Sequence, residues 1–473
     1  MSEPTAETQL PTDANPAVEH ATSAPVDARS PLSPPYRWLS IGMFALIFLA
    51  AFEAMAVTTI MPLVASDLHG EALYALAFAV PLAAGIIGMV IAGNWTDRSG
   101  PLPSLVTAAG LFVVGLLIAG TATDMNVLIV GRFVHGLSGA AVIVPLYVIV
   151  ARVYPDALRA RVFAGFAAAW VIPSMVGPAV AGLVAETWSW HWVFLGVIVL
   201  LVPAAAMILP PVLRVRDQIA GDPAVAWSFG RVGWAVLVAV GALGVSLAKE
   251  FGDPWRWVVA AVAVVLVVVA VRPLLPVGTL RAARGLPATV LSRFVVAGAF
   301  FGSEIYLPYL LMEDYDFSAS AAGAVLTGAG VSWAVASWLQ GRLGERVSNA
   351  RAVVIGSAGL LAALVVVLAV AVFTLPPAIA FVAWTLAGGA MGFMYPRHSV
   401  SVLGQSKVSE QGFNSAALSI AESLGAAVAL AVTALVSSAF VAGGFAPDFA
   451  VTVVVAVVAL LLASRVRPAA SRS

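Results

Sequence analysis

The chain has 473 residues, of which 61% are apolar and only 10% are charged, with 24 basic and 24 acidic side chains. Soluble domains carry about 25% charged residues, so this chain has too little polar surface to be water-soluble. A net charge of zero argues against a nucleic-acid partner, because phosphate binding needs a basic face. The absence of cysteine excludes disulfides, thiolate metal sites and cysteine nucleophiles. Most of the surface is therefore expected to face lipid.

Residues 1–36 are rich in Ser, Thr, Pro and Ala and lack the basic start of a signal peptide, so they are predicted to form a disordered tail. From Arg37 onward, apolar stretches long enough to cross about 30 Å of hydrocarbon follow one another. They are continuous, unlike the alternating segments of a β-barrel, and therefore predict an all-α integral membrane protein. Fourteen spans are expected: 38–64, 73–95, 103–122, 126–150, 161–185, 191–212, 231–250, 255–275, 288–312, 321–341, 350–374, 377–402, 411–438 and 447–465.

The basic residues predict the orientation of these spans. If the N-terminus is inside, Lys249 and Arg256 lie in outer loops, Arg132 and Arg397 lie within spans, and the other twenty of the 24 basic residues lie on the inner side. Both termini are thus expected to be cytoplasmic.

Two loops indicate an internal repeat. Gly93 is followed by Asp97 and Arg98 after the second span, and Gly341 is followed by Glu345 and Arg346 after the tenth. Parallel repeats around a midplane site are typical of transporters. The predicted organisation is a tail (1–36), a six-helix bundle (37–212), a linker with two extra helices (213–286), a second six-helix bundle (287–466) and a tail (467–473), a 6 + 2 + 6 arrangement of pseudo-symmetric halves.

Several motifs resemble those of the major facilitator superfamily, and within it the drug:proton antiporters with fourteen spans. Gly93, Asp97, Arg98 and Gly100 match the loop motif G-x-L-a-D-R-x-G-R-R, although Trp95 replaces its Leu, and Pro101 and Leu102 replace its basic pair. Further matches are Glu53 nine residues before Pro62, Arg132 with Gly136, Gly139, Ala140 and Ala141, the run Gly177-Pro178-Ala179-Val180-Ala181-Gly182, and Trp190-His191-Trp192-Val193-Phe194.

The resemblance implies a major facilitator fold and alternating access driven by protons. It assigns Asp97 and Arg98 to a cytoplasmic gate that meets the start of the penultimate span near Ser409 and Glu410, and Glu345 with Arg346 to the counterpart gate. Span 5 is predicted to bend at a hinge made of Pro173, Gly177, Pro178 and Gly182; the alternative is that Gly and Pro are simply common in membrane helices.

An ionisable side chain at bilayer depth is costly, so each one is expected to have an ion-pair partner, a water-filled cavity or a functional role. Counting about 1.5 Å per residue places Glu53, Arg132, His135, Glu304 and Glu422 there. A buried carboxyl can load a proton on one side and release it on the other, so these five are the candidates for proton coupling, with Glu53 first. A packing role remains the alternative for the three acids and for His135. Arg397 and His398 are interpreted as interfacial anchors.

Six aromatic residues are candidates for an apolar substrate cavity suited to lipophilic cations, with lipid or core positions as the alternative: Trp170, Phe301, Tyr306, Trp333, Trp384 and Tyr395. The sequence lacks Walker, His-Glu-x-x-His and Gly-x-Ser-x-Gly motifs, so an enzyme is not expected, and neither a metal nor a cofactor other than the proton is predicted.

The predicted function is export of a small lipophilic, cationic or amphiphilic compound in exchange for protons, as a multidrug-type efflux transporter. A proton-coupled nutrient symporter, a facilitator or a lipid exporter would use the same fold. The expected partners are the substrate, protons and the lipid bilayer, with a monomeric protein in the cell membrane. The excess of Arg over Lys, 22 to 2, points to a bacterium with a GC-rich genome.

Overall fold

The computed structural model describes residues 30–70, 73–248, 251–252, 254–317, 319–439 and 444–467, which form helices joined by short connections. The helices are α1 (Arg37–Asp67), α2 (Tyr74–Ser99), α3 (Pro101–Gly120), α4 (Met125–Val153), α5 (Asp156–Thr187), α6 (His191–Arg214), α7 (Phe229–Leu247), α8 (Trp255–Ala270), α9 (Leu286–Glu304), α10 (Tyr306–Glu313), α11 (Ala319–Leu343), α12 (Asn349–Phe373), α13 (Pro377–Gln405), α14 (Gln411–Ala439) and α15 (Ala446–Ala463). Most of both predicted tails, residues 1–29 and 468–473, lies outside the described residues; residues 30–36 form turns that lead into α1.

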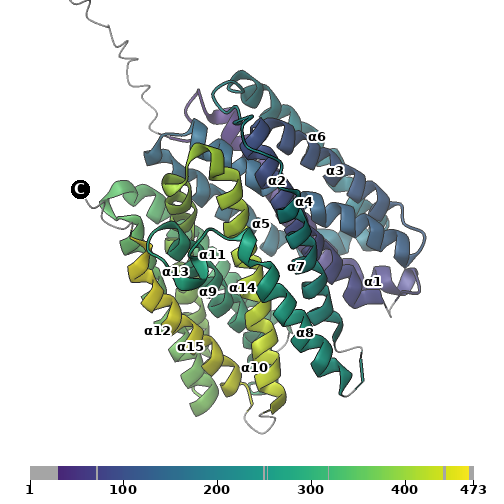
Figure 1. The fold of residues 1–473 in the computed structure, drawn as a ribbon. Coiled ribbons are helices and arrows are strands. Elements are labelled where there is room, and N and C mark those ends of the chain that lie inside the picture. Colours follow the sequence, from purple (N-terminus) through teal and green to yellow (C-terminus); the bar gives the residue numbers. More distant parts are fainter. Residues whose placement is uncertain are drawn as a thin grey trace, which may run out of the picture.

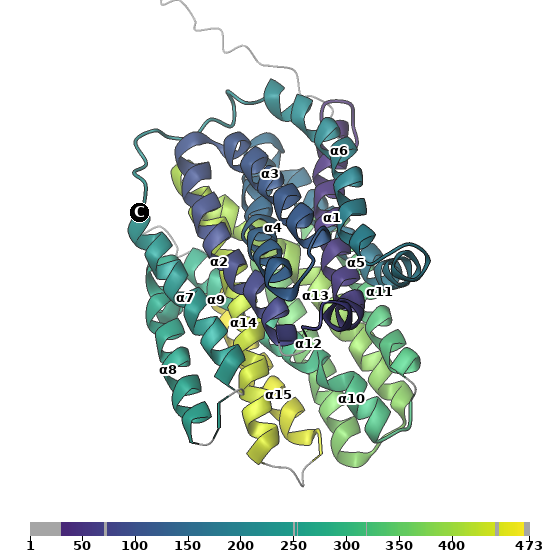
Figure 2. The same ribbon diagram turned by 90° about the vertical axis from the view of Figure 1, so that its right-hand side faces the viewer.

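The helices form two bundles, α1 to α6 and α9 to α15, that lie side by side (Figures 1 and 2). The bundles meet where α2 packs against α14 and where α5 packs against α11. Between them in sequence, α7 packs on α2 and α8 packs on α7, so these two helices lie at the edge of the molecule (Figure 2). The helix order of the two halves corresponds if α9 and α10 together take the place of α1.

Small residues allow close helix packing. A Cβ on Gly88 would collide with the backbone of Leu137, and one on Gly136 with the backbone of Pro81, so α2 and α4 approach each other to backbone contact. Close approach through small residues is typical of helices in membranes, where lipid provides no hydrophobic drive for association.

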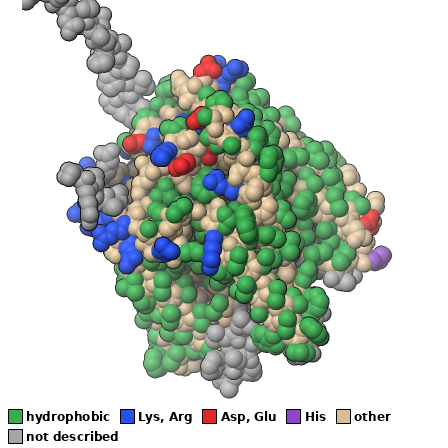
Figure 3. Space-filling view, in the orientation of Figure 1, with side chains coloured by type: hydrophobic (Ala, Val, Ile, Leu, Met, Phe, Trp, Pro, Cys, Tyr) green, Lys and Arg blue, Asp and Glu red, His purple; other side chains and the backbone are tan. Residues whose placement is uncertain are grey.

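Eleven helical segments in the described part of the chain are long and apolar enough to cross a membrane. A twelfth apolar helix, Phe229–Val245 within α7, is shorter, and α5 and α11 are not among the eleven. Hydrophobic side chains cover most of the visible surface, while Lys and Arg gather toward its upper and left-hand parts (Figure 3). The protein is therefore a multi-pass membrane protein, and the count of fourteen spans stays a prediction.

The expected span 288–312 lies within one candidate membrane span, Leu286–Glu313, although the structure divides it into two helices. It is divided at Ile305 into α9 and α10, two residues after Ser303 and directly after Glu304. The apolar pattern is continuous across this point, which explains why the sequence predicts one span.

Two hydrogen bonds, one between side chains and one between backbone groups, connect helix ends. Ser40 near the start of α1 bonds the Tyr154 hydroxyl after α4, with 2.7 Å between the oxygens. The backbone N–H of Gly285, before α9, donates to the Arg465 carbonyl after α15 at 2.9 Å. The start of the described chain thus lies beside the C-terminal end of α4, and its end lies beside the start of α9.

Candidate functional site: two buried ion clusters and an inter-bundle contact

The first cluster lies inside the N-terminal bundle, halfway along α1. Glu53 on α1 is 1% exposed, and its two carboxylate oxygens have different partners on α4. Arg132 Nη1 lies 2.8 Å from Oε1, and His135 Nε2 lies 3.0 Å from Oε2. Arg132 and His135 are three residues apart and so share one face of their helix. The sequence predicts that Arg132 and His135 share a helix face and that Glu53 lies at a similar depth; the structure joins the three in one site.

The surroundings of this cluster are tight. Arg132 Nε also donates to the Ala77 carbonyl of α2 at 3.4 Å, and the His135 ring lies 4.7 Å from that of Phe112 on α3. Removing one member of a buried ion pair costs about 3–5 kcal/mol, because the remaining charge is left uncompensated. Protonation of Glu53 would therefore change the forces between α1 and α4 directly.

The second cluster lies in the C-terminal bundle and contains an arginine that sequence reasoning missed. Arg293 on α9 is 4% exposed and donates from Nε and Nη2 to Oε2 of Glu422 on α14, at 3.0 and 2.7 Å. Its Nη1 donates to the Tyr395 carbonyl on α13 at 3.0 Å. Arg293 was assigned to the inner side, and this was wrong. The sequence does contain a sign of this burial, because Arg293 lies about 10 Å along α9 from its first residue, counted at 1.5 Å per residue.

Glu304 belongs to neither cluster. It is the last residue of α9, it is partly buried, and it makes no ion pair within the described part of the chain. Of the five proton-coupling candidates, the structure thus groups Glu53, Arg132 and His135, gives Glu422 an unforeseen partner, and leaves Glu304 by itself.

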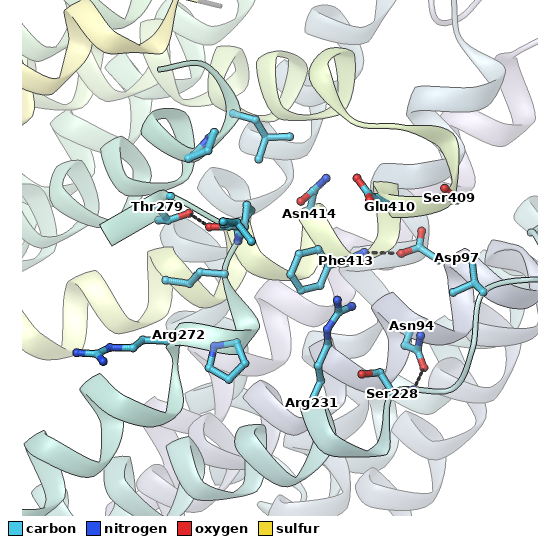
Figure 4. A pocket seen from close by; sticks show the side chains of 18 of the residues that line it. Asn94, Asp97, Ser228, Arg231, Arg272, Thr279, Ser409, Glu410, Phe413 and Asn414 are labelled. Carbon is cyan, nitrogen blue, oxygen red and sulfur yellow. Dashed lines mark hydrogen bonds between the residues drawn. The ribbon is translucent and has the colours of Figure 1, made fainter. Parts of the chain in front are cut away.

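Asp97 connects the two bundles. Its carboxylate accepts hydrogen bonds from the backbone N–H groups of Gly412 and Phe413, at 2.6 and 2.8 Å, and so caps the start of α14 (Figure 4). Free N–H groups and the helix dipole favour a negative charge there. Gly93 lies opposite Gly412, and a Cβ on Gly93 would come within 2.8 Å of the Gly412 carbonyl oxygen. The partners are thus Gly412 and Phe413, two to four residues beyond the expected Ser409 and Glu410.

Arg98 does not pair with α14. Its Nη1 donates to the carbonyls of Val225 at 2.7 Å and Pro223 at 3.3 Å, in the connection that follows α6. The N–H of Asp222 in turn donates to the Asp97 carbonyl at 2.8 Å. Gly100 has a φ of 84° and lies against Ile219 and Gly221, so this turn needs a residue without a side chain.

The same connection is tied to α4. Arg152 donates to the carbonyls of Ile219 and Ala220, at 3.0 and 2.8 Å, and to Gln411 Oε1 at 2.9 Å. Residues 215–228, which we call the strap, therefore run across the point where α2, α4 and α14 meet. No sequence signal marked the strap, because its contacts use backbone carbonyls.

The counterpart loop of the second half is less fully described. Arg346 is exposed, and the side chain of Glu345 lies outside the described residues.

Arg397 is 5% exposed and donates to Asn349 Oδ1 at 3.0 Å and to the Gly344 carbonyl. His398 is fully buried, with Nε2 3.0 Å from Ser292 Oγ. His398 lies inside the bundle, so its interpretation as an interfacial anchor was wrong. Arg397 is buried but binds the connection between α11 and α12, and its role as an anchor stays a prediction.

The predicted hinge lies in an unbroken helix, since α5 runs from Asp156 to Thr187. Pro173 and Gly177 are buried, and a Cβ on Gly177 would meet Met55 at 3.4 Å and Phe52 at 3.7 Å. Gly182 has open space around it, and the side chain of Pro178 lies outside the described residues. Bending at these residues stays a prediction.

The aromatic candidates fall into different environments. Trp384 is fully buried and stacks on Phe300, with ring centroids 4.8 Å apart, so it is a core residue of the C-terminal bundle. Trp333 and Tyr395 pack edge to face at 5.0 Å. Phe301 packs against Phe300, Tyr306 is partly buried at the start of α10, and Trp170 on α5 is 42% exposed.

A membrane-embedded protein with two helical bundles and buried, charge-balanced clusters has the architecture of a secondary transporter. The sequence pattern of the Major Facilitator Superfamily matches residues 43–225 and 289–473. The chain belongs to this family, which consists of transporters and not of enzymes, as predicted. The unmatched interval between the two parts contains α7 and α8.

Among curated proteins, the chain is similar to Multidrug resistance protein 3 of Bacillus subtilis (strain 168), with 24% identity over 62% of this chain and 58% of that protein. It is also similar to the multidrug efflux pump SdrM of Staphylococcus aureus (strain N315), with 24% identity over 76% of this chain and 81% of the pump. The chain thus spans less than two thirds of the first relative.

Among solved structures, the human organic anion transporter MFSD10 (TETRAN) has a TM-score of 0.67 at 16% identity, over 91% of this chain and 99% of that one. The proton:xylose symporter XylE has a TM-score of 0.64 at 13% identity, over 90% and 94%. At such identities the likeness concerns the fold alone.

Proposed function

We propose that the protein exports a small lipophilic compound, cationic or amphiphilic, in exchange for protons across the cell membrane of a bacterium. It does so by alternating access on a fourteen-span, 6 + 2 + 6 major facilitator fold with cytoplasmic termini. The observation that carries the proposal is the Glu53–Arg132–His135 cluster. The distant similarity to multidrug efflux pumps supports the direction of transport and the substrate class.

In this mechanism Glu53 holds the transported proton. Ionised Glu53 ties α1 to α4 through Arg132 and His135, and protonation removes the charge that both partners face. His135, whose imidazole can both accept and donate a proton, passes the proton to Glu53. The attraction between Glu53 and Arg132 is thus lost and re-formed once in each transport cycle.

Asp97 and Arg98 act as the gate on the cytoplasmic side. The Asp97 bonds to α14 hold that side closed, and Arg98 clamps the strap over the closed contact. The conformation described is therefore closed toward the cytoplasm, and opening requires α2 and α14 to separate.

Proton flux in proteoliposomes tests the proposal. Addition of a lipophilic cation to acid-loaded vesicles should release protons with the wild-type protein. Glu53→Gln should abolish this release while substrate exchange without a pH gradient continues. Glu186→Gln, the same change at an exposed position on α5, is the matched control. Undiminished proton release with Glu53→Gln would contradict the coupling role of the cluster.

A further inference from the structure

A groove of about 660 Å³ lies where α1 begins, beside the contact between α5 and α11. These three helices supply its walls, and residues 30–32, which precede α1, also line it. Because α5 packs against both α1 and α11 (Figure 2), the groove has walls from both bundles. Its volume is in the range of sites for small organic ligands, about 300–1,000 Å³. None of the residues proposed for proton coupling or for the gates lines this groove.

The walls are apolar over a depth that corresponds to one leaflet of the membrane. Phe44 lies about 10 Å from the start of α1, Ala168 about 18 Å from the start of α5 and Ala334 about 13 Å from the end of α11. One leaflet contains about 15 Å of hydrocarbon. The groove has space at this depth, because a Cβ on Gly165 would meet no atom within 4 Å. It also opens to the outside of the protein, since Trp338 is 53% exposed.

Two arginines lie at the end of the groove that is closest to the helix termini. Arg161 on α5 donates from Nε to the Gly341 carbonyl on α11 at 3.2 Å, across the seam between the bundles. Arg342 is exposed, and its guanidinium lies 3.9 Å above the centre of the Trp338 ring. The described residues that line the groove include no acidic side chain. The lining therefore carries positive charge at this end and none deeper in the groove.

An anionic phospholipid has the complementary distribution of charge and apolar surface. Guanidinium groups bind phosphate oxygens through charge-assisted hydrogen bonds, and basic pockets between membrane helices bind anionic headgroups. A zwitterionic headgroup would bring an ammonium group next to two arginines, with no acid in the lining to pair with it. Free phosphate would reach the arginines but would leave the apolar walls unfilled. The groove thus favours an anionic lipid over both.

We propose that this groove binds one anionic phospholipid, with its phosphate on Arg161 and Arg342 and one acyl chain along Phe44, Gly165 and Trp338. Because Arg161 belongs to the N-terminal bundle and Arg342 to the C-terminal bundle, the bound phosphate links the two bundles beside the contact between α5 and α11. Lipid binding does not depend on the proposed transport function. Only the assignment of the lipid to the cytoplasmic leaflet rests on the proposed orientation.

Two lipids with the same acyl chains test the headgroup part of the site, namely dioleoyl phosphatidylglycerol, which is anionic, and dioleoyl phosphatidylcholine, which is zwitterionic. Native mass spectrometry of the delipidated full-length protein in detergent gives the Kd of the most tightly bound lipid. A basic residue strengthens binding to an anionic lipid by about fivefold, so we expect a preference of about 25-fold for phosphatidylglycerol. The double variant Arg161→Gln with Arg342→Gln should lose this preference. Arg351→Gln, at an exposed arginine near the start of α12, is the matched control and should keep it.

Gly165→Leu tests the acyl-chain part, because its side chain fills the space that the lipid would occupy. Displacement of about two methylene groups from the groove should weaken the binding of both lipids by about tenfold. Gly110→Leu on α3, where a Cβ also meets no atom within 4 Å, should change neither Kd.

Three results would overturn the proposal. They are equal affinities of the wild-type protein for the two lipids, an unchanged preference in the double arginine variant, and displacement of phosphatidylglycerol by an equal concentration of glycerol phosphate, which would indicate a site for free phosphate. Phosphatidylglycerol binding that requires both arginines, in a protein without proton-coupled export, would retain the lipid site and refute the proposed antiport.

Discussion

Gly412→Ala is expected to open the contact between α2 and α14, although it should strengthen the helix in isolation. Alanine is favoured over glycine within a helix by about 1 kcal/mol, but this gain is the same whether the two bundles are closed or apart. It therefore cancels in the opening equilibrium, and only the contact between the helices decides the outcome.

The magnitude follows from the packing. A Cβ on Gly412 would overlap the Gly93 carbonyl oxygen and lie 2.9 Å from Asp97 Oδ1. Carbon–oxygen contacts need about 3.3 Å, so α2 and α14 must separate by on the order of 1 Å. Such a shift lengthens the 2.6 and 2.8 Å hydrogen bonds of Asp97 beyond hydrogen-bonding distance. Hydrogen bonds to charged groups contribute about 1.5–3 kcal/mol each, so the closed state loses about 3 kcal/mol or more.

Thiol labelling measures this shift, because the chain has no cysteine. Ser415→Cys places a single thiol next to the contact, at a residue that is 1% exposed and whose hydroxyl makes no hydrogen bond to the described residues. With 1.4 kcal/mol per factor of ten, labelling of the detergent-purified protein by a hydrophilic maleimide should accelerate about 100-fold in Gly412→Ala.

Gly404→Ala is the matched control, because a Cβ there meets open space. Its labelling rate should equal that of the Ser415→Cys parent. If Gly412→Ala labelled no faster than Gly404→Ala, the contact between Gly93, Asp97 and α14 would not be what holds this side closed.

Three other changes probe the remaining contacts. Arg132→Met should lower the free energy of unfolding, measured by denaturant unfolding in detergent, by about 3–5 kcal/mol. The double variant Arg132→Met with Glu53→Gln should be less destabilised than Arg132→Met alone. If the losses of stability of the two single variants simply added in the double variant, the pairing would be contradicted. Arg98→Ala removes the bonds to Pro223 and Val225, so proteolysis within the strap should become faster, whereas the exposed Arg216→Ala should leave it unchanged. Tyr154→Phe deletes the bond to Ser40 and should cost about 1 kcal/mol of stability, and an unchanged unfolding midpoint would show that the hydroxyl bond adds nothing.

The sequence by itself determined the class of the protein. Long apolar runs with so few charges can be accommodated only as helices in lipid, because no water is present there to satisfy the backbone. The spacing of Gly93, Asp97 and Arg98 and of their counterparts in the second half indicated a repeat. The rarity of charges at depth selected five residues, Glu53, Arg132, His135, Glu304 and Glu422, of which Glu304 joins neither cluster.

Only the tertiary structure decided which of these groups meet. Periodicity places Arg132 and His135 on one face of α4, but it does not say that this face turns toward Glu53, 79 residues earlier. Arg293 is seven residues into its helix, where a basic side chain can equally reach the interface or pair inside, and only packing against α14 settles its partner. The strap is invisible in the sequence for a related reason: it is held by backbone carbonyls, which every residue possesses.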